Sequence, residues 1–284
     1  MVLKEFPPGL ATRGTVRVYR VVHFKTAAPT VKVYPPAPEQ CLQLFVHDPE
    51  IVEYPNGRRL QWDSVLAGAH DVVVRRHVPS RFLMIQAVFE TGALYRLTGI
   101  AGVELQNAYL DAQSVLGSAI RPLREALGEA SSYADMIACV DAFIARLKTG
   151  QKLAHPVESV LRWLRDHPGA TIEHAAGKAA LSLRQFERTC LERTGMGPRE
   201  LASLARFDRA FHYKLQSPGL DWLSIAIACG YYDYQHMARD FRLFAGMTPP
   251  GLLETQHSSP EHLLGIRQEF DLTYATPAAV DAEK

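Results

Sequence analysis

AAGKAALSLRQFERTCLERTGMGP (Ala175–Pro198) and AIACGYYDYQHMARDFRLFAGMTP (Ala226–Pro249) are two copies of one sequence pattern. Aligned without a gap, the copies lie 51 residues apart, which places Arg188 on Arg239, and both close with Gly-Met-x-Pro. Two copies of one small helical unit predict a protein that binds, at two sites, a partner molecule whose own structure repeats. Double-helical DNA is the leading candidate for such a partner, because its grooves recur at a fixed spacing.

Each copy predicts a helix, a tight turn and a second, capped helix, which is the order of a helix-turn-helix unit. In the first unit, Ile172–Thr194, a capping box of Ser182 and Gln185 begins the second helix. In the second unit, Trp222–Ala245, Asp233 provides the corresponding cap. A longer helix between the two units is expected to join them.

The second helix of each unit divides into an apolar and a polar face. The inward residues are Phe186 and Cys190 in the first unit, and Met237 and Phe241 in the second. The candidate base-reading residues on the polar faces are Arg184, Glu187 and Arg188, then Tyr234, Gln235 and Arg239. Arginine can bind guanine through two hydrogen bonds, glutamine can bind adenine, and glutamate can accept from cytosine. Ser182, beside the exposed amides of a helix start, is the candidate phosphate contact.

Each of these residues also has a plainer interpretation. Duplicated helices can form a merely structural array, and a single arginine usually belongs to the solvated surface. Glu187 could orient a neighbouring arginine, and Tyr234 could simply cover the core. The equivalence of Arg188 and Arg239 across the repeat favours the DNA-reading interpretation.

Bulk composition bounds the class of protein without identifying it. A chain of 284 residues with 47% hydrophobic and 21% charged residues predicts two globular domains. No apolar run has the length of a membrane span or a signal peptide, and the four scattered cysteines favour buried thiols in a reducing cytoplasm. The net charge of +1 gives no general support for nucleic-acid binding, so the DNA hypothesis depends on where the arginines lie.

Residues 1–102 predict a mostly β fold. Runs rich in β-branched and aromatic residues occur at Val16–Lys25, Cys41–Asp48, Asp71–Val78 and Arg81–Glu90, and Asn56-Gly57 signals a hairpin. Short strands at this spacing predict a small barrel or sandwich.

The period of the apolar residues changes after Gly102. Val103–Ala126 and Tyr133–Leu147 predict a pair of helices attached to the β-rich domain. The expected fold class is α+β: a mostly β, barrel-like domain with a trailing helical pair, then an all-α domain of two helix-turn-helix units joined by a long linker helix. The predicted divisions are residues 1–150 for the β-rich domain, 155–256 for the DNA-binding domain and 257–284 for a C-terminal tail.

No metal or catalytic site is expected. His23, His47, His70 and His77 lie in the β-rich domain, but no His-x-His with a following Glu occurs at close spacing. No nucleophile–base pair or carboxylate dyad stands out, so the sequence predicts no catalytic residue, no metal and no cofactor. The alternative hypothesis is a small-molecule-modifying or metal-binding enzyme domain fused to a DNA-docking module.

Three segments of the C-terminal half carry a family resemblance: SLRQFERTCLERTGMGPREL (182–201), LARFDRAFHYKL (204–215) and IAIACGYYDYQHMARDFRLFAGMTPP (225–250). With them, Pro156–Leu253 resembles the DNA-binding domain of the AraC/XylS family of bacterial transcription regulators. The resemblance implies two helix-turn-helix units that enter successive major grooves on one face of DNA, with the six candidate residues at the base-reading positions. Tyr232-Asp233-Tyr234 is bulky and acidic where many members have small polar residues, so the first unit is expected to make the dominant base contacts.

Two N-terminal segments, VLAGAHDVVV (65–74) and VFETGALYRLTGIAGVELQNAYLDAQSVLG (88–117), are similar to the small β-domain that precedes this DNA-binding domain in one subgroup. That domain resembles the cupin-like effector and dimerisation domain of the wider family. The resemblance implies a cytoplasmic transcription regulator, not an enzyme, that binds double-stranded DNA. A small-molecule effector, a second copy of the chain and RNA polymerase are the further partners it implies.

Overall fold

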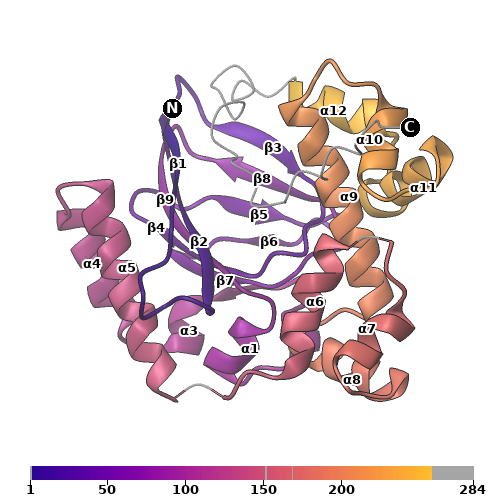
Figure 1. The fold of residues 1–284 in the computed structure, drawn as a ribbon. Coiled ribbons are helices and arrows are strands. Elements are labelled where there is room, and N and C mark those ends of the chain that lie inside the picture. Colours follow the sequence, from indigo (N-terminus) through magenta and orange to yellow (C-terminus); the bar gives the residue numbers. More distant parts are fainter. Residues whose placement is uncertain (1, 151, 168, 258–284) are drawn as a thin grey trace, which may run out of the picture.

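The computed structural model describes residues 2–150, 152–167 and 169–257. The fold is α+β, with a β-rich N-terminal domain and helices from Pro156 to His257 (Figure 1). The predicted tail, apart from His257, lies outside the described residues. Over the described part of the chain, no helix combines the length and the hydropathy needed to cross a bilayer.

Two antiparallel sheets form the β-rich domain. The first has the strand order β1 (Val2–Phe6), β2 (Val16–Lys25), β9 (Arg81–Phe89), β4 (Cys41–Phe45), β7 (Ser64–Ala67) and β10 (Tyr109–Asp111). The second has the order β3 (Thr30–Tyr34), β8 (Val74–Val78), β5 (Ile51–Glu53) and β6 (Arg59–Leu60). Phe24, Phe45, Phe82 and other buried side chains fill the space between the sheets, which is how a barrel-like domain buries its core.

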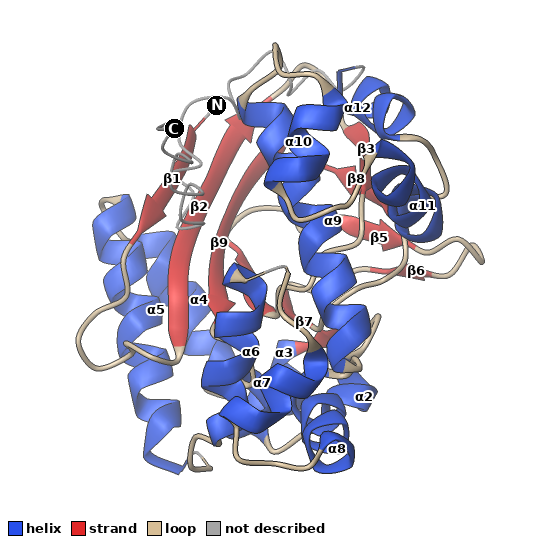
Figure 2. Ribbon diagram, turned by 45° about the vertical axis from the view of Figure 1, so that its right-hand side comes forward, coloured by secondary structure: helices blue, strands red, loops and turns tan. Residues whose placement is uncertain are grey.

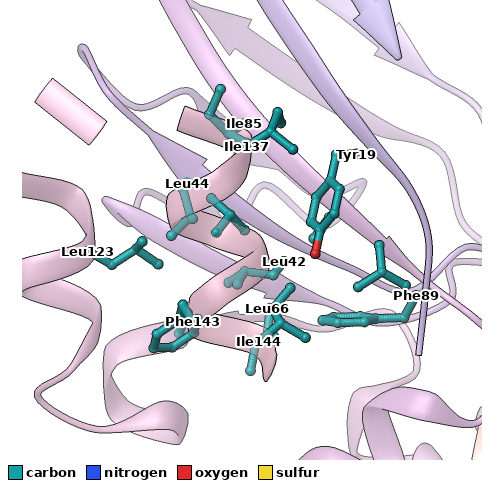
Figure 3. Packing of buried hydrophobic residues seen from close by; sticks show 14 of the residues in the cluster. Tyr19, Leu42, Leu44, Leu66, Ile85, Phe89, Leu123, Ile137, Phe143 and Ile144 are labelled. Atoms are coloured by element: carbon teal, nitrogen blue, oxygen red, sulfur yellow. The ribbon is translucent and has the colours of Figure 1, made fainter. Parts of the chain in front are cut away.

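A helical layer covers the outer face of the first sheet. It consists of α4 (Ile120–Glu129) and α5 (Tyr133–Leu147). These two helices lie on the opposite side of the molecule from the helices formed by Pro156–His257 (Figure 1). Figure 3 shows strand residues such as Leu44 packed with Phe143 and Ile144 of α5. The Tyr19 hydroxyl donates to Asp141 of α5 at 2.9 Å, so a polar contact fixes the helix within this apolar layer.

Most of the predicted strands are present. β2 matches Val16–Lys25, and β9 ends one residue before the predicted Glu90. Asn56-Gly57 turns the chain between β5 and β6, and Gly57 has a φ of 81°, which favours glycine. The strands β1, β3, β7 and β10 were not predicted; β7 and β10 have only four and three residues, too few to show an alternating pattern.

The prediction of one helix over Val103–Ala126 is wrong. The segment divides into α2 (Gly102–Leu105), strand β10, α3 (Ala112–Leu116) and the start of α4. Positive φ angles at Asn107 (55°) and Gly117 (81°) interrupt the helical backbone. β10 pairs with β7 at the edge of the first sheet, so a tertiary pairing overrides the apolar period.

The C-terminal helices are α6 (Pro156–Asp166), α7 (Ile172–Lys178), α8 (Leu183–Thr194), α9 (Pro198–Gln216), α10 (Trp222–Ala228), α11 (Tyr234–Ala245) and α12 (Pro249–His257). A short helix, α1 (Ala93–Thr98), and a 3-10 turn, Lys148–Gly150, belong to the connecting segments that precede them. Figure 2 shows α9 running between the group α6–α8 and the group α10–α12. The two groups have separate apolar cores, and Leu201 of α9 contacts both.

Candidate nucleic-acid interface

The first helix-turn-helix unit consists of α7 and α8, each with a side-chain cap. The Thr171 hydroxyl accepts from the His174 amide at 3.2 Å. Ser182 Oγ accepts from the Gln185 amide at 3.3 Å, and Gln185 Oε1 accepts from the Ser182 amide at 3.0 Å, which confirms the predicted capping box. Because the Ser182 hydroxyl also donates to Gln185 Oε1, it already serves the cap, and its contact with phosphate stays a prediction.

The second unit consists of α10 and α11, both capped by aspartate. Asp221 accepts from the amides of Leu223 and Ser224, each at 2.9 Å. Asp233 accepts from the His236 amide at 2.7 Å, as its place before the helix predicted. A carboxylate cap also complements the positive end of the helix dipole. The second unit therefore has two carboxylate caps, where the first unit has neutral hydroxyl caps.

The gapless alignment of the repeat is wrong in its first part. The caps Thr171 and Asp221 are 50 residues apart, whereas the caps Ser182 and Asp233 are 51 residues apart. The turn of the second unit therefore contains one additional residue. The hydrogen bond from Tyr231 N to Ala226 O matches the bond from Leu181 N to Ala176 O, so the additional residue is Tyr232.

Tyr232 is the functional candidate that the gapless alignment concealed. Its side chain is 87% exposed and lies directly before the cap of α11. Two residues before Tyr232, Gly230 has a φ of 83°. Ala180 occupies the equivalent position in the turn of the first unit, with a φ of 54°. Glycine adopts this backbone readily, whereas alanine adopts it with strain, so the two turns differ in conformational cost as well as in length.

The second helix of each unit, α8 or α11, is called its recognition helix here. The predicted apolar faces of both recognition helices are confirmed. Phe186 and Cys190 of α8 and Met237 and Phe241 of α11 are fully buried. Phe241 packs edge-on against Phe207 of the linker helix, with 4.7 Å between ring centroids. This packing fixes the rotation of each recognition helix about its axis, and thus decides which residues face solvent.

The candidate reading residues lie on the opposite faces. Arg184, Arg188, Gln235 and Arg239 are exposed, and Glu187 and Tyr234 are half-buried. Within the described part of the chain, Arg184, Arg188 and Arg239 form no ion pair or hydrogen bond through their side chains. Three guanidinium groups thus remain available to an external acceptor, which is the condition that DNA reading requires.

Two of the candidates fit the reading role less well. Glu187 has no ion pair with a neighbouring arginine among the described residues, and its counterpart in the second unit is the buried Ala238. Tyr234 packs against the core of the second unit, as the plainer interpretation expected. Their contacts with DNA bases stay predictions, and the structure gives more support to the exposed arginines and Gln235.

The linker helix α9 sets the separation of the two units. Its 19 residues span about 28 Å at 1.5 Å per residue. Phe207, Phe211 and Leu204 bury one face in the core of the second unit, and Leu201 and Ala202 contact the core of the first. The two recognition helices therefore belong to one packed array with a fixed spacing.

The β-rich domain holds the C-terminal end of the first recognition helix. Glu158 of α6 forms ion pairs with Arg96 of α1, at 3.1 Å, and with Arg193 of α8. All three side chains are buried, so a single carboxylate neutralises two buried guanidinium groups from two parts of the chain. Sequence patterns did not reveal this triad, because its members are distant in the chain and belong to no motif.

Further contacts surround the triad. The Tyr95 hydroxyl donates to Glu192 of α8 at 2.6 Å, and the Arg193 guanidinium lies 4.9 Å from the centroid of the Tyr95 ring. Gly102 of α2 meets Gly195, at the end of α8, so closely that a Cβ on Gly102 would lie 2.1 Å from the Gly195 nitrogen. These contacts leave the N-terminal half of α8, with Arg184 and Arg188, exposed.

The histidines of the β-rich domain do not converge. His23 lies 2.7 Å from the Tyr133 hydroxyl with the ring of His47 nearby, whereas His77 contacts Glu53 at 3.0 Å. Burial, followed by the charge of Arg76, lowers the pKa of His70 to about 3. Among the described residues, no three His, Cys, Asp or Glu side chains are placed to hold a metal ion.

Comparison with known proteins places the helical half of the chain. Residues 175–254 match a family described as a helix-turn-helix domain. The HTH-type transcriptional activator RhaS of Escherichia fergusonii is 29% identical over 102 residues, which cover 35% of this chain and 36% of RhaS. The match thus spans about a third of the length of that relative, and it concerns a DNA-binding module rather than an enzyme.

Comparison of structures extends the likeness to the β-rich domain. A crystal structure of a variant of apo ToxT from Vibrio cholerae covers 84% of this chain and 97% of its own, with a TM-score of 0.51 and 10% identity. At this identity the likeness shows a shared fold, a β-rich domain followed by a helical one. The C-terminal domain of AraT from Geobacillus stearothermophilus covers 37% of this chain and 88% of its own, with 21% identity and a TM-score of 0.34.

Proposed function

This chain carries the C-terminal helix-turn-helix domain of the AraC/XylS family, and from that premise we propose that it is a sequence-specific DNA-binding regulator of transcription. The observation that carries the proposal is the pair of capped helices, α8 and α11, fixed to one linker helix with unpaired arginines on their open faces. A protein built in this way can hold one side of a duplex at two places.

In this proposal the recognition helices enter successive major grooves. Arg188 and Arg239 take equivalent positions in the two units, and each can bind a guanine through two hydrogen bonds. Arg184 reads a second base in the first unit, and Gln235 suits adenine in the second. The first unit makes the dominant base contacts, because it presents the two exposed arginines Arg184 and Arg188, whereas the second presents Arg239 and has carboxylate caps.

Glu187, Tyr234 and Ser182 complete the proposed contact set. Glu187 would accept from cytosine, and Tyr234 would contact a base edge from the first turn of α11. Ser182 would contact phosphate together with the free amides at the start of α8. Phosphate contacts fix the register of the protein on DNA, whereas base contacts supply its sequence preference.

The β-rich domain is proposed to modulate DNA binding. Its residues Tyr95 and Gly102 contact the end of α8 directly, and Arg96 shares the Glu158 carboxylate with Arg193 of α8, so a change in this domain can alter the position of a reading helix. We propose a cupin-like role in which a small effector or dimerisation provides that change, in a cytoplasmic protein that acts on RNA polymerase at its operators. An element with two arrangements and a ligand that prefers one of them is sufficient for such control.

The test is selection of bound sequences from a random DNA pool by the full chain at one fixed salt concentration, because salt strongly changes affinity for DNA. The expected result is a pair of short motifs about one helical turn apart, roughly 34 Å between centres. Salt-sensitive binding without an enriched motif would show that the helices hold phosphate without reading bases.

Two variants locate the reading face. Arg188→Ala should cost about 1–3 kcal/mol of specific binding and relax the preference at one base position. Arg199→Ala is the matched control, since Arg199 is an exposed arginine outside the recognition helices that pairs with Glu173. If both variants select the same motif as the wild type, Arg188 does not read a base.

A further inference from the structure

A cluster of aromatic and cationic side chains lies where α6 and α7 pack side by side (Figure 2). The half-buried Trp163 ring stacks on His167, with 4.5 Å between ring centroids, and on His174, with 5.3 Å. The Lys178 ammonium lies over the same ring, 4.6 Å from its centroid. His167, His174 and Lys178 are exposed, and these four residues are called the Trp163 cluster.

Contacts within the Trp163 cluster hold its polar groups in place. Because a carbonyl only accepts, His167 Nδ1 donates to the Trp163 carbonyl at 2.8 Å. His174 and Lys178 are four residues apart on α7, so they share one face of that helix. Attraction to an aromatic face restricts the long lysine side chain, which then loses less entropy when it binds a partner. Among the described residues, the His174 ring has no hydrogen-bond partner.

The Lys178 charge has no counter-charge of its own. Asp166 pairs with Arg165 at 3.3 Å, and Glu173 pairs with Arg199, also at 3.3 Å. Over the described ranges of the chain, the Lys178 side chain forms no ion pair and no hydrogen bond. A free ammonium group beside a free imidazole fits an anionic partner.

The second helix-turn-helix unit has no such cluster. The offset of 50 residues that relates the caps of α7 and α10 defines the equivalent positions. The equivalents of Trp163, His174 and Lys178 are Tyr213, Ser224 and Ala228. Lys214, near the end of α9, is 8% exposed and donates to the carbonyls of Pro218 and Leu220. The free cation is therefore a property of the first unit and not of the repeat.

The place of the cluster in the first unit indicates which anion it fits. In a helix-turn-helix, the second helix lies in the major groove while the first helix crosses the sugar-phosphate backbone. Helix α7 is the first helix of its unit, so its exposed residues His174 and Lys178 lie at the level of a DNA strand. The exposed Arg184 of α8 follows after the turn, which makes the cluster continuous with the proposed reading surface.

We propose that the Trp163 cluster binds a phosphate of the DNA strand beside the groove that α8 enters. Lys178 supplies the charge, His174 supplies an N–H donor, and Trp163 holds both in position. The contact fixes the register of the first unit on DNA and reads no base. It rests on the proposed function and extends its contact set to α6 and α7.

The experiment measures the affinity of the full chain for two duplexes over a series of salt concentrations. One duplex carries the selected motif, and the other has a scrambled sequence. Lys178→Ala should weaken binding to both by the same factor and leave the selected motif unchanged. The slope of log affinity against log salt should fall in magnitude by about 0.9, the value for one phosphate contact. Lys178→Arg keeps the charge and should keep the slope.

The matched control is Lys152→Ala. Lys152 is also exposed and also lies over an aromatic ring, 4.3 Å from the Tyr95 centroid, but it precedes the helix-turn-helix units. Its removal changes the net charge equally and should leave the slope as in the wild type. Trp163→Leu should weaken binding to both duplexes, whereas Trp163→Phe, which retains an aromatic face, should recover most of the affinity. Equal binding by these two variants would overturn the role of Trp163.

The proposal is overturned if Lys178→Ala keeps the wild-type slope on both duplexes, or if Lys152→Ala lowers the slope as much. A changed motif in Lys178→Ala would show base reading and would overturn the assignment to phosphate. Failure of the proposed function is distinguishable. If the wild type enriches no motif, that function fails, while the slope on the scrambled duplex still decides this proposal. A wild type that binds neither duplex would overturn both.

Discussion

Glu158→Gln is the substitution whose effect the structure defines most sharply. The Glu158 carboxylate is 3% exposed and is shared by Arg96 of the β-rich domain and Arg193 of the first recognition helix. Glutamine preserves the size of the side chain, but it removes the negative charge and places an NH₂ group where two guanidinium groups donate. Two buried positive charges would then lack a counter-charge.

The magnitude follows from this burial. Breaking a buried ion pair by removing one partner typically destabilises a protein by about 3–5 kcal/mol, because the remaining charge stays desolvated. For a chain of this size, whose unfolding entropy is about 0.6 kcal/mol/K, the melting temperature should fall by roughly 5–8 °C. Replacement of all three members, with Arg96→Met, Glu158→Leu and Arg193→Met, should restore most of the loss, since no uncompensated charge then remains.

The assay is urea unfolding of the full chain, followed by circular dichroism at fixed pH and salt. Glu173→Gln is the control, because Glu173 pairs with Arg199 at 3.3 Å on the surface, where such pairs contribute about 0–1 kcal/mol. A loss below about 1 kcal/mol for Glu158→Gln would refute the reasoning. An equal loss in the triple variant would also refute it, because packing rather than charge would then explain the effect.

Three further predictions follow from other contacts. Gly102→Ala should separate α2 from the end of α8, because its Cβ would lie 2.1 Å from the Gly195 nitrogen; increased hydrogen exchange at Gly195 would show this, and unchanged exchange would contradict the close approach. Tyr232→Ser should leave the unfolding free energy within about 0.5 kcal/mol, because the side chain is exposed, yet weaken DNA binding if the inserted residue touches the duplex; equal affinities would remove Tyr232 from the interface. Burial by itself would lower the pKa of His212, but the Asp208 carboxylate raises it to about 9. Because this pKa exceeds the unfolded value of about 6.5, the stabilisation is complete below pH 6.5 and is lost as pH rises through 9, and His212→Gln should flatten that part of the pH–stability curve.

Local sequence signals predicted the helical half of the chain well. The capping box at Ser182, the cap at Asp233 and the apolar positions of Phe186 and Phe241 all act within one or two helical turns. For this reason the limits of both helix-turn-helix units, Ile172–Thr194 and Trp222–Ala245, agree with the sequence prediction. The same signals indicated which face of each recognition helix is exposed.

Signals that depend on distant partners were missed. The apolar period over Val103–Ala126 predicted a helix, whereas Tyr109–Asp111 completes the edge of a sheet by pairing with Val65–Ala67, more than 40 residues earlier in the chain. From the sequence alone, an alignment of the two repeat copies without a gap was as plausible as one with a gap of one residue. Only the hydrogen bonds of the two turns show that Tyr232 is an additional residue.

The sequence by itself determined that this protein has two capped recognition helices with arginines on one face, because caps and helical periodicity are properties of neighbouring residues. Only the tertiary structure decided that Glu158 joins Arg96 to Arg193, and that the Gln40 amide is buried without a hydrogen-bond partner among the described residues. Buried ion pairs and buried amides of this kind arise where segments far apart in the chain come together. The free-energy cost of burying a charge or an amide depends on the groups that these distant segments place around it, and no local sequence pattern encodes those groups.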